Sequence, residues 1–324
     1  MIRPIDVVRC VLIAAVLAAG TTSAQESYPD KPIRFISPYA PGGSTTVVAH
    51  FIAQKLTESW GQQVLVENRS GGNTVIGTDA VAKSAADGYT VLVAASDHIL
   101  VPLLFKVPYD PIKDFAPVAT LANGQLVLVL NPLVPANNLK EFLAYAKSKP
   151  GQLNFGTPGA GGLQHLAHEL LNLTAGIKTQ HVPYKGGGPA IIDLIGGSLQ
   201  FYLGTSASVV PHIKSGKIKA IAVSGKKRLP ALPQVPTFTE AGLAGFEVEY
   251  WNGVLAPAAT PRAIVEKLSA QIAKILVLPD FKEMLAGQGV EPFINTPDQY
   301  AAVLKADMAK YAKIIKDANI KMEY

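Results

Sequence analysis

IRFISPYAPGGST, at residues 33–45, joins a β-branched and aromatic run, a turn rich in proline and glycine, and two hydroxyl residues. We predict a strand over 33–37 and a helix over 45–60, connected by this short loop. A strand that runs directly into a helix is the first half of a βαβ unit, in which successive strands lie parallel. The stretch therefore indicates an α/β fold, whose ligands bind beyond the carboxyl ends of the strands.

The same alternation of strand and helix patterns continues through the chain. Further strands are predicted at 63–67, 90–94, 125–130, 153–156, 179–182, 199–203, 218–223 and 247–255, and helices at 74–86, 139–148, 163–175, 189–195, 208–214, 261–276, near 281, and 297–319. The strand at 125–130 is a candidate to cross between two such series. The pattern predicts two lobes with mainly parallel sheets and a ligand cleft between them.

The first 24 residues have the pattern of a secretory signal peptide. Arg3 and Arg9 supply positive charge, residues 11–20 form an apolar run, and Thr22-Ser23-Ala24 offers small residues for cleavage. The run is too short to span a bilayer, and no later segment reaches about 18 consecutive apolar residues. We therefore expect residues 1–24 to be removed during export to the periplasm.

Cysteine and charge narrow the class of protein. The only cysteine, Cys10, lies in the predicted signal, so the exported chain has no disulfide and no thiolate metal site. Its roughly 300 residues are enough for two domains without such cross-links. Losing Arg3, Arg9 and Asp6 takes the net charge from +5 to +4, a mild surplus. The one basic triplet, at 226–228, is expected to be a solvated turn, which gives no support to nucleic-acid binding.

Three glycine-rich loops at strand ends are the candidate binding elements. Glycines let the backbone approach a ligand, and the free N–H groups at a helix start attract an anion. A tight strand-to-helix turn is the alternative for any one loop, but three of them over two lobes favour an anion clamp. The expected ligand contacts are Tyr39, Pro41, Gly42, Gly43, Ser44, Thr45 and Thr46; Thr157, Gly159, Gly161, Gly162, Gln164 and His165; Tyr184 and Lys185; and, after two further strands, Ser96, Asp97 and His98, and Thr205 and Ser206.

Catalytic patterns fit the chain less well. A zinc protease needs His-Glu-x-x-His, whereas His165 and His168 are followed by Glu169, which favours capping or surface histidines. Residues 96–98 are Ser-Asp-His, but a catalytic triad is a spatial arrangement, so a cleft-lining loop is the better interpretation. No Gly-x-Ser-x-Gly elbow occurs. We predict neither catalytic residues nor a metal or other cofactor.

Motifs in a fixed order connect these loops to a known family. They are YPDKPIR at 28–34, PGG at 41–43, VENR at 66–69 with GG at 71–72, ADGYT at 86–90, TPG at 157–159 with HLA at 165–167, VPYKG at 182–186 with GPA at 188–190, PHIKSG at 211–216, LPQVPT at 232–237 and AP at 256–257. Each is unspecific alone, but the ordered set is specific. The chain closely resembles the Bug or TctC family, the extracytoplasmic solute receptors of tripartite tricarboxylate transporters.

The resemblance implies a type II periplasmic binding fold. Residues 25–125 with 229–324 would form the first lobe, and 126–228 the second. It also implies that the loops at 41–43 and 157–159 hold a ligand carboxylate through backbone groups, often with bridging waters, and that the closed protein docks on a membrane permease.

The chain departs from the family pattern at two helix positions and in one loop. Many relatives carry aspartate where this chain has Thr46, and arginine where it has His50, so we expect an amino-acid ligand to be disfavoured. Asp97 stands in a loop that is usually rich in Ser and Thr. It is either a specificity element that recognises a hydroxyl group or an ordinary loop residue.

Aromatic residues near strand ends could form the rest of the cleft wall. Tyr39, Tyr184, Tyr202 and Trp251 are the candidates, and for at least two of them core packing is the better expectation. We therefore predict a monomeric periplasmic receptor that captures a di- or tricarboxylate or an aromatic acid for uptake by a secondary transporter. The alternatives are a co-receptor for a membrane sensor and, with less support, a periplasmic hydrolase.

Overall fold

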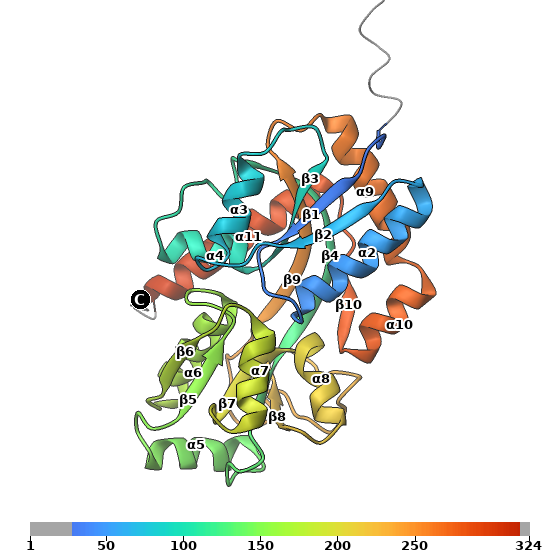
Figure 1. The fold of residues 1–324 in the computed structure, drawn as a ribbon. Coiled ribbons are helices and arrows are strands. Elements are labelled where there is room, and N and C mark those ends of the chain that lie inside the picture. The colour runs from blue at the N-terminus through green and yellow to red at the C-terminus, as the bar shows by residue number, and fades with distance from the viewer. Residues whose placement is uncertain (1–27, 318–324) are drawn as a thin grey trace, which may run out of the picture.

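The computed structural model describes residues 28–317, in two α/β bodies joined by long strands (Figure 1). The predicted signal peptide, and the end of the predicted last helix at 318–319, lie outside the described residues. The strand order is β2-β1-β3-β9-β4-β7-β5-β6, and β8 and β10 both pair with β4. The predicted two-lobed α/β architecture is confirmed.

The first body is built on three parallel strands and flanking helices. The strands are β1 (Ile33–Ser37), β2 (Val64–Asn68) and β3 (Thr90–Ala95), and the helices are α2 (Ser44–Trp60), α3 (Val75–Ala82), α4 (Asp97–Leu104), α9 (Arg262–Leu276), α10 (Pro279–Gly287) and α11 (Pro297–Asp317). β1 lies between β2 and β3. The C-terminal helices thus return to the N-terminal sheet (Figure 1).

The second body repeats the plan. Its strands are β5 (Asn154–Thr157), β6 (Gln180–Pro183), β7 (Phe201–Thr205) and β8 (Lys219–Val223), and its helices are α5 (Leu139–Ser148), α6 (Leu163–Ala175), α7 (Gly187–Gly196) and α8 (Ser206–Lys214). β5 pairs in parallel with β6 and β7. In both bodies, therefore, the carboxyl ends of parallel strands lead into helix N-termini.

Two strands cross between the bodies. β4 (Phe115–Leu130) pairs with β9 (Glu249–Pro257) as far as Gln125, and from Leu126 onward it pairs with β7 and β8. The short β10 (Val290–Pro292) also pairs with β4. Among the described residues, every antiparallel pairing involves β4 or β9.

The crossing strand predicted at 125–130 is present but begins ten residues earlier, at Phe115. Its first part was missed because Pro117 and several small residues interrupt the β-branched pattern. The pairing with β9 shifts register between Pro117 and Ala119, as expected where proline cannot donate a ladder hydrogen bond.

Ser224 connects β4 to the segment before β9 by hydrogen bonds. Its hydroxyl accepts a hydrogen bond from the Leu126 N–H at 2.9 Å and donates one to the Val248 carbonyl. The segment before β9 is thereby held against the middle of β4. The predicted lobe limits, at 125/126 and 228/229, stay a prediction.

One local expectation was wrong. Residues 96–98 are not a loop, because helix α4 begins at Asp97 immediately after β3 ends at Ala95. The helix is short and contains Pro102, so it shows little of the periodicity by which longer helices are recognised.

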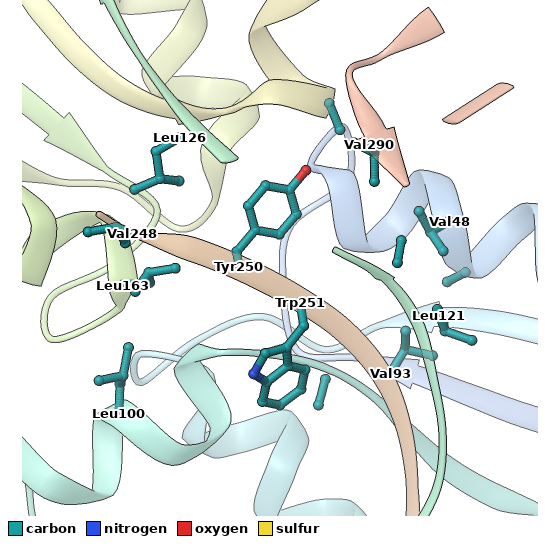
Figure 2. Packing of buried hydrophobic residues seen from close by; sticks show 14 of the residues in the cluster. Val48, Val93, Leu100, Leu121, Leu126, Leu163, Val248, Tyr250, Trp251 and Val290 are labelled. Carbon is teal, nitrogen blue, oxygen red and sulfur yellow. The ribbon is translucent and has the colours of Figure 1, made fainter. Parts of the chain in front are cut away.

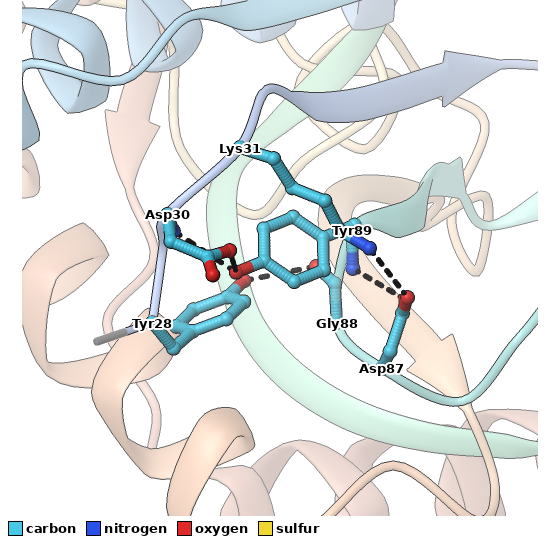
Figure 3. Close-up of polar contacts among 6 residues, drawn as sticks. All are labelled: Tyr28, Asp30, Lys31, Asp87, Gly88 and Tyr89. Atoms are coloured by element: carbon cyan, nitrogen blue, oxygen red, sulfur yellow. Dashed lines mark hydrogen bonds and ion pairs between the residues drawn. The ribbon is translucent and has the colours of Figure 1, made fainter. Parts of the chain in front are cut away.

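The motifs at 28–34 and 86–90 have a structural role. The Tyr28 hydroxyl donates to the Gly88 carbonyl at 2.9 Å, and the Tyr89 hydroxyl accepts from the Asp30 N–H at 3.0 Å. Lys31 and Asp87 form an ion pair at 3.3 Å. Figure 3 shows these contacts joining the segment before β1 to the turn before β3.

Candidate ligand-binding cleft

A cavity of about 40 Å³ lies between the two bodies. Its lining consists of strand ends and helix starts: Tyr39, Gly43, Ser44 and Thr45; Ala95, Ser96 and Asp97; Pro158, Leu163 and Gln164; Gly187; Tyr202, Thr205 and Ser208; and Tyr250. The first turns of α2, α4, α6, α7 and α8 all contribute to it. The lining contains one acidic side chain and no lysine, arginine or histidine.

The start of α2 presents free backbone donors to the cavity. Gly43 is its N-cap, and no side chain caps the helix. The Thr45 hydroxyl accepts a hydrogen bond from Asn252 at 2.9 Å. Thr46 is turned aside, where its hydroxyl accepts from Asn68 at 3.1 Å. Pro41 and Gly42 shape the turn without lining the cavity, and Gly42 has φ 93°, a conformation that favours glycine.

The start of α6 is capped from the opposite body. The Leu163 N–H donates to Oδ1 of Asp97 at 2.7 Å. Oδ2 of the same carboxylate accepts from the Tyr39 hydroxyl at 3.1 Å. Asp97 is buried, and burial raises the pKa of its carboxyl, while the bonds from Leu163 and Tyr39 act to lower it. Asp97 is thus the first residue of a helix, and its side chain is largely buried.

Much of the second glycine-rich loop lies next to the cavity without lining it. The residues expected there that do not line it are Thr157, Gly159, Gly161, Gly162 and His165. The Thr157 hydroxyl donates to the Gly159 carbonyl at 2.8 Å, which closes the turn. Gln164 does line the cavity, together with Pro158 and Leu163, which the sequence did not single out.

Only some of the expected residues of the third loop and the β7–α8 connection line the cavity. Lys185 lies outside the lining, and its carbonyl accepts from the Ala40 N–H at 3.2 Å, across the cleft. The Tyr184 hydroxyl donates to Asp193 at 2.6 Å, within the second body. Thr205 lines the cavity, whereas the Ser206 hydroxyl donates to the Gly289 carbonyl at 2.8 Å and lies outside it.

Three tyrosines form the aromatic wall. Tyr39, Tyr202 and Tyr250 line the cavity, while Tyr184 and Trp251 do not. Tyr250 and Trp251 project to opposite sides of β9, and Trp251 packs into the first body (Figure 2). Tyr250 was missed because a strand exposes alternate residues, and the sequence does not say which of two aromatic neighbours faces the ligand. Ala95 and Ser208 also lacked a signal, and Gly187 was not among the expected contacts although it belongs to the third glycine-rich loop.

Ser96, Asp97 and His98 each form hydrogen bonds with a different part of the structure. The Ser96 hydroxyl accepts from the Trp251 backbone N–H at 3.1 Å. Nε2 of His98 bonds to the Pro111 carbonyl at 2.8 Å, and burial lowers the pKa of this histidine to about 4. His98 therefore lies in the core of the first body, outside the cavity lining, rather than at the ligand position expected for it.

The histidines of α6 are buried, not on the surface. Nδ1 of His165 accepts from the Gly161 N–H at 3.0 Å, which is the expected capping role. His168 is fully enclosed and joins α6 to β7. Within residues 28–317, no group of three or more His, Cys, Asp or Glu side chains is arranged to hold a metal ion.

Three hydrogen bonds join strand-to-helix connections of the two bodies across the cleft. Besides the bonds to Asp97 and Lys185, the Ala160 N–H donates to the Asn73 side chain at 3.1 Å. Each joins a strand-to-helix connection of one body to the other. The structure is therefore a closed form, in which helix N-termini from both bodies surround one small cavity.

Comparison with known proteins identifies relatives along nearly the whole chain. A family model described as tripartite tricarboxylate transporter family receptor matches residues 48–320. Protein BugT of Bordetella pertussis is 36% identical over 326 residues, covering 100% of this chain and 99% of BugT. Periplasmic binding protein BugD superposes with a TM-score of 0.88 at 33% identity, covering 91% of this chain and 99% of BugD. An R. palustris protein solved with adipate gives the same TM-score at 32% identity, with 91% and 99% covered.

These relatives are receptors rather than enzymes, so the prediction of a binding protein is confirmed. In the described part of the chain, no helix is long and apolar enough to cross a membrane. The fold, the placement of glycine-rich strand-to-helix loops around one cleft and the family match agree. The chain belongs to the TctC family of tripartite tricarboxylate transporter receptors.

Proposed function

We propose that this protein captures a small organic carboxylate in the periplasm and delivers it to the membrane subunits of a tripartite tricarboxylate-type transporter. The observation that carries the proposal is the convergence of several helix N-termini on one cavity whose lining has no cationic side chain. Helix N-termini bind anions through free N–H groups and their dipoles. The adipate bound to one relative is a dicarboxylate, which supports the same class of ligand.

The ligand carboxylate binds at the N-terminus of α2. This helix has no side-chain cap, and the hydroxyls of Ser44 and Thr45 stand beside its first N–H groups. At α6, by contrast, the Leu163 N–H already has an acceptor. The backbone of Gly187 and the hydroxyls of Thr205 and Ser208 complete the binding surface from the second body.

Binding requires the two bodies to separate and close again. A cavity of about 40 Å³ holds only about three waters at ~10–15 Å³ each, so the closed form is too small to admit a ligand of the size of adipate unless the bodies separate. The motion takes place at β4 and β9, with residues 25–125 and 229–324 as one lobe and 126–228 as the other. Residues 1–24 are removed during export, and N-terminal sequencing of the secreted protein should begin at Gln25.

The test compares two neighbouring threonines. Thr45→Val and Thr46→Val each remove one hydroxyl that accepts a bond from an asparagine, but only Thr45 lines the cavity. Calorimetry with adipate, malate and benzoate, and with their amides, should show binding of at least one carboxylate and none of its amide. Thr45→Val should weaken that binding at least tenfold, and Thr46→Val should leave it within about twofold.

Two results would count against the proposal. One is no binding to any carboxylate in such a panel by protein that unfolds cooperatively. The other is equal binding of a carboxylate and its uncharged amide, because a site built from helix N-termini must distinguish them by charge.

A further inference from the structure

Asp97 is the one charged side chain in the cavity wall, and it comes from the first body. It is 8% exposed, and its carboxylate has two donors, the Leu163 N–H at 2.7 Å and the Tyr39 hydroxyl at 3.1 Å. A carboxylate offers about four acceptor positions on its two oxygens. Each oxygen of Asp97 therefore retains an acceptor position beyond the single bond that the protein supplies.

The surroundings of Asp97 do not neutralise it. The cavity lining contains no lysine, arginine or histidine, and no ion pair is found for Asp97 among the described residues. The titratable side chains that interact with it are the tyrosines Tyr39, Tyr202 and Tyr311, whose pKa values are raised mainly by burial, so they stay uncharged. A ligand group beside Asp97 thus meets an acceptor that lacks a cationic partner.

This setting separates ligands by chemistry. A hydroxyl or ammonium group can donate to a free position of Asp97, and an ammonium also supplies the missing positive charge. A bare methylene leaves the buried carboxylate underbonded, and a second carboxylate repels it. Sites built to bond a substrate hydroxyl reject the analogue that lacks it more strongly than apolar pockets reject a change of size.

We propose that Asp97 is the specificity-determining residue of the cleft, and that it selects carboxylates carrying a hydroxyl or ammonium donor over the same skeleton without one. The inference rests on the proposed function, because it assumes that the ligand carboxylate binds at the N-terminus of α2. It also changes an earlier expectation. The argument from Thr46 against amino acids rested on the loss of an acceptor at the start of α2, whereas Thr46 faces Asn68 and Asp97 supplies a carboxylate in the cavity wall.

The closing of the cleft strengthens the selection. The bond from the Leu163 N–H to Asp97 spans the two bodies, so it forms only as they meet. In the closed form Asp97 is shielded from water, and a ligand without a donor must then compete with the loss of hydration of that carboxylate. A ligand with a donor replaces the lost water contact.

The test uses skeletons that differ in one group. Succinate, malate and aspartate share four carbons and carry hydrogen, hydroxyl and ammonium at one position, and adipate with 2-hydroxyadipate and butyrate with 3-hydroxybutyrate extend the comparison. Calorimetry on the native protein should give at least tenfold tighter binding to the donor-bearing member of a pair. In Asp97→Asn, whose amide can donate as well as accept, that ratio should fall to within about twofold or reverse.

Controls keep the outcomes distinct. Asp87→Asn removes an equal charge at the surface, 42% exposed and paired with Lys31, and should keep the native ratio. Asp97→Ser serves if the asparagine variant does not fold. Binding without discrimination in the native protein, or a ratio unchanged in both Asp97 variants, overturns the role of Asp97 and leaves carboxylate capture standing. Binding to no member of the panel overturns the proposed function and this inference with it.

Discussion

Gly161 lies in close contact with the opposite body. It lies in the β5–α6 loop of the second body with φ 75°, and a Cβ atom there would stand 2.1 Å from Cε2 of Phe105. Phe105 directly follows α4 in the first body. Any side chain at position 161 must therefore displace the Phe105 ring or keep the cleft from closing fully.

Gly161→Ala should weaken ligand binding at least tenfold, because the closed form is the one that binds tightly. Gly176→Ala is its matched control: it lies at the other end of α6, has φ 62°, and has nothing within 4 Å of the added Cβ. Both variants carry the cost of a positive φ, about 1 kcal/mol. Calorimetry should separate them, and equal affinity of the two variants would show that the Phe105 contact does not limit closure.

Single residues were harder to predict than the loops that contain them. The N-termini of α2 and α6 could be located from the sequence because glycines and hydroxyl residues mark helix starts. The sequence could not say that Thr45 faces the cavity and Thr46 does not, since successive helix residues point about 100° apart and the helix rotation is set by packing. The role of Asp97 depends on Leu163, 66 residues away, and such a contact leaves no local pattern.

At the scale of elements, His168 joins a helix to a strand. Its Nδ1–H donates to the Gln164 carbonyl at 2.7 Å, and its Nε2 accepts from the Leu203 N–H of β7 at 3.2 Å. The ring stacks on Phe155, with 4.1 Å between centroids. Burial lowers the pKa of His168 to about 3, so it is neutral in the folded protein.

Lowering the pH should therefore destabilise the protein already at pH values well above those at which carboxylates become protonated. Below about pH 6.5 the unfolded chain binds a proton at His168 that the folded chain does not, so stability is full above that pH and falls toward the folded pKa of about 3. Each such histidine contributes a slope of up to about 1.4 kcal/mol per pH unit.

Urea unfolding between pH 7.5 and 5 measures that slope. His168→Gln should be less stable at pH 7.5, because glutamine lacks the ring that stacks on Phe155, but should lose less stability on acidification. His50→Gln, on the exposed side of α2, is the control and should keep the native slope. A slope unaltered in His168→Gln would mean that this histidine is protonated without unfolding.

Element prediction succeeded where local chemistry is strong. The strand at 33–37 and the helices at 139–148 and 163–175 match the structure to the residue. Asn138 caps α5 through its side chain, and Gly176 ends α6 in the left-handed conformation, so both boundaries are encoded locally. The three-residue β10 has no such signal, because it exists only through pairing with β4.

For the whole molecule, the crossing strands connect the cavity to the hinge. Tyr250 lines the cavity, while its neighbour Trp251 pairs with Asn123 on β4 and donates from Nε1 to Asp307 of α11 at 2.9 Å. A change in the twist of β9 that moves Tyr250 must also move Trp251. The sequence suggested two lobes and a crossing strand, but the second crossing strand pairs with residues more than 120 positions earlier, which no local pattern reveals.

Trp251 should therefore report closure by its fluorescence. The chain has two tryptophans, and the other, Trp60, lies at the far end of α2 against Tyr28, with 6.3 Å between ring centroids. Ligand addition should change the emission of Trp60→Phe as it does that of the native protein. The change should be lost in Trp251→Phe, while small-angle scattering still shows compaction. If instead the signal survives in Trp251→Phe and disappears in Trp60→Phe, the motion does not pass through β4 and β9, and the hinge must lie elsewhere.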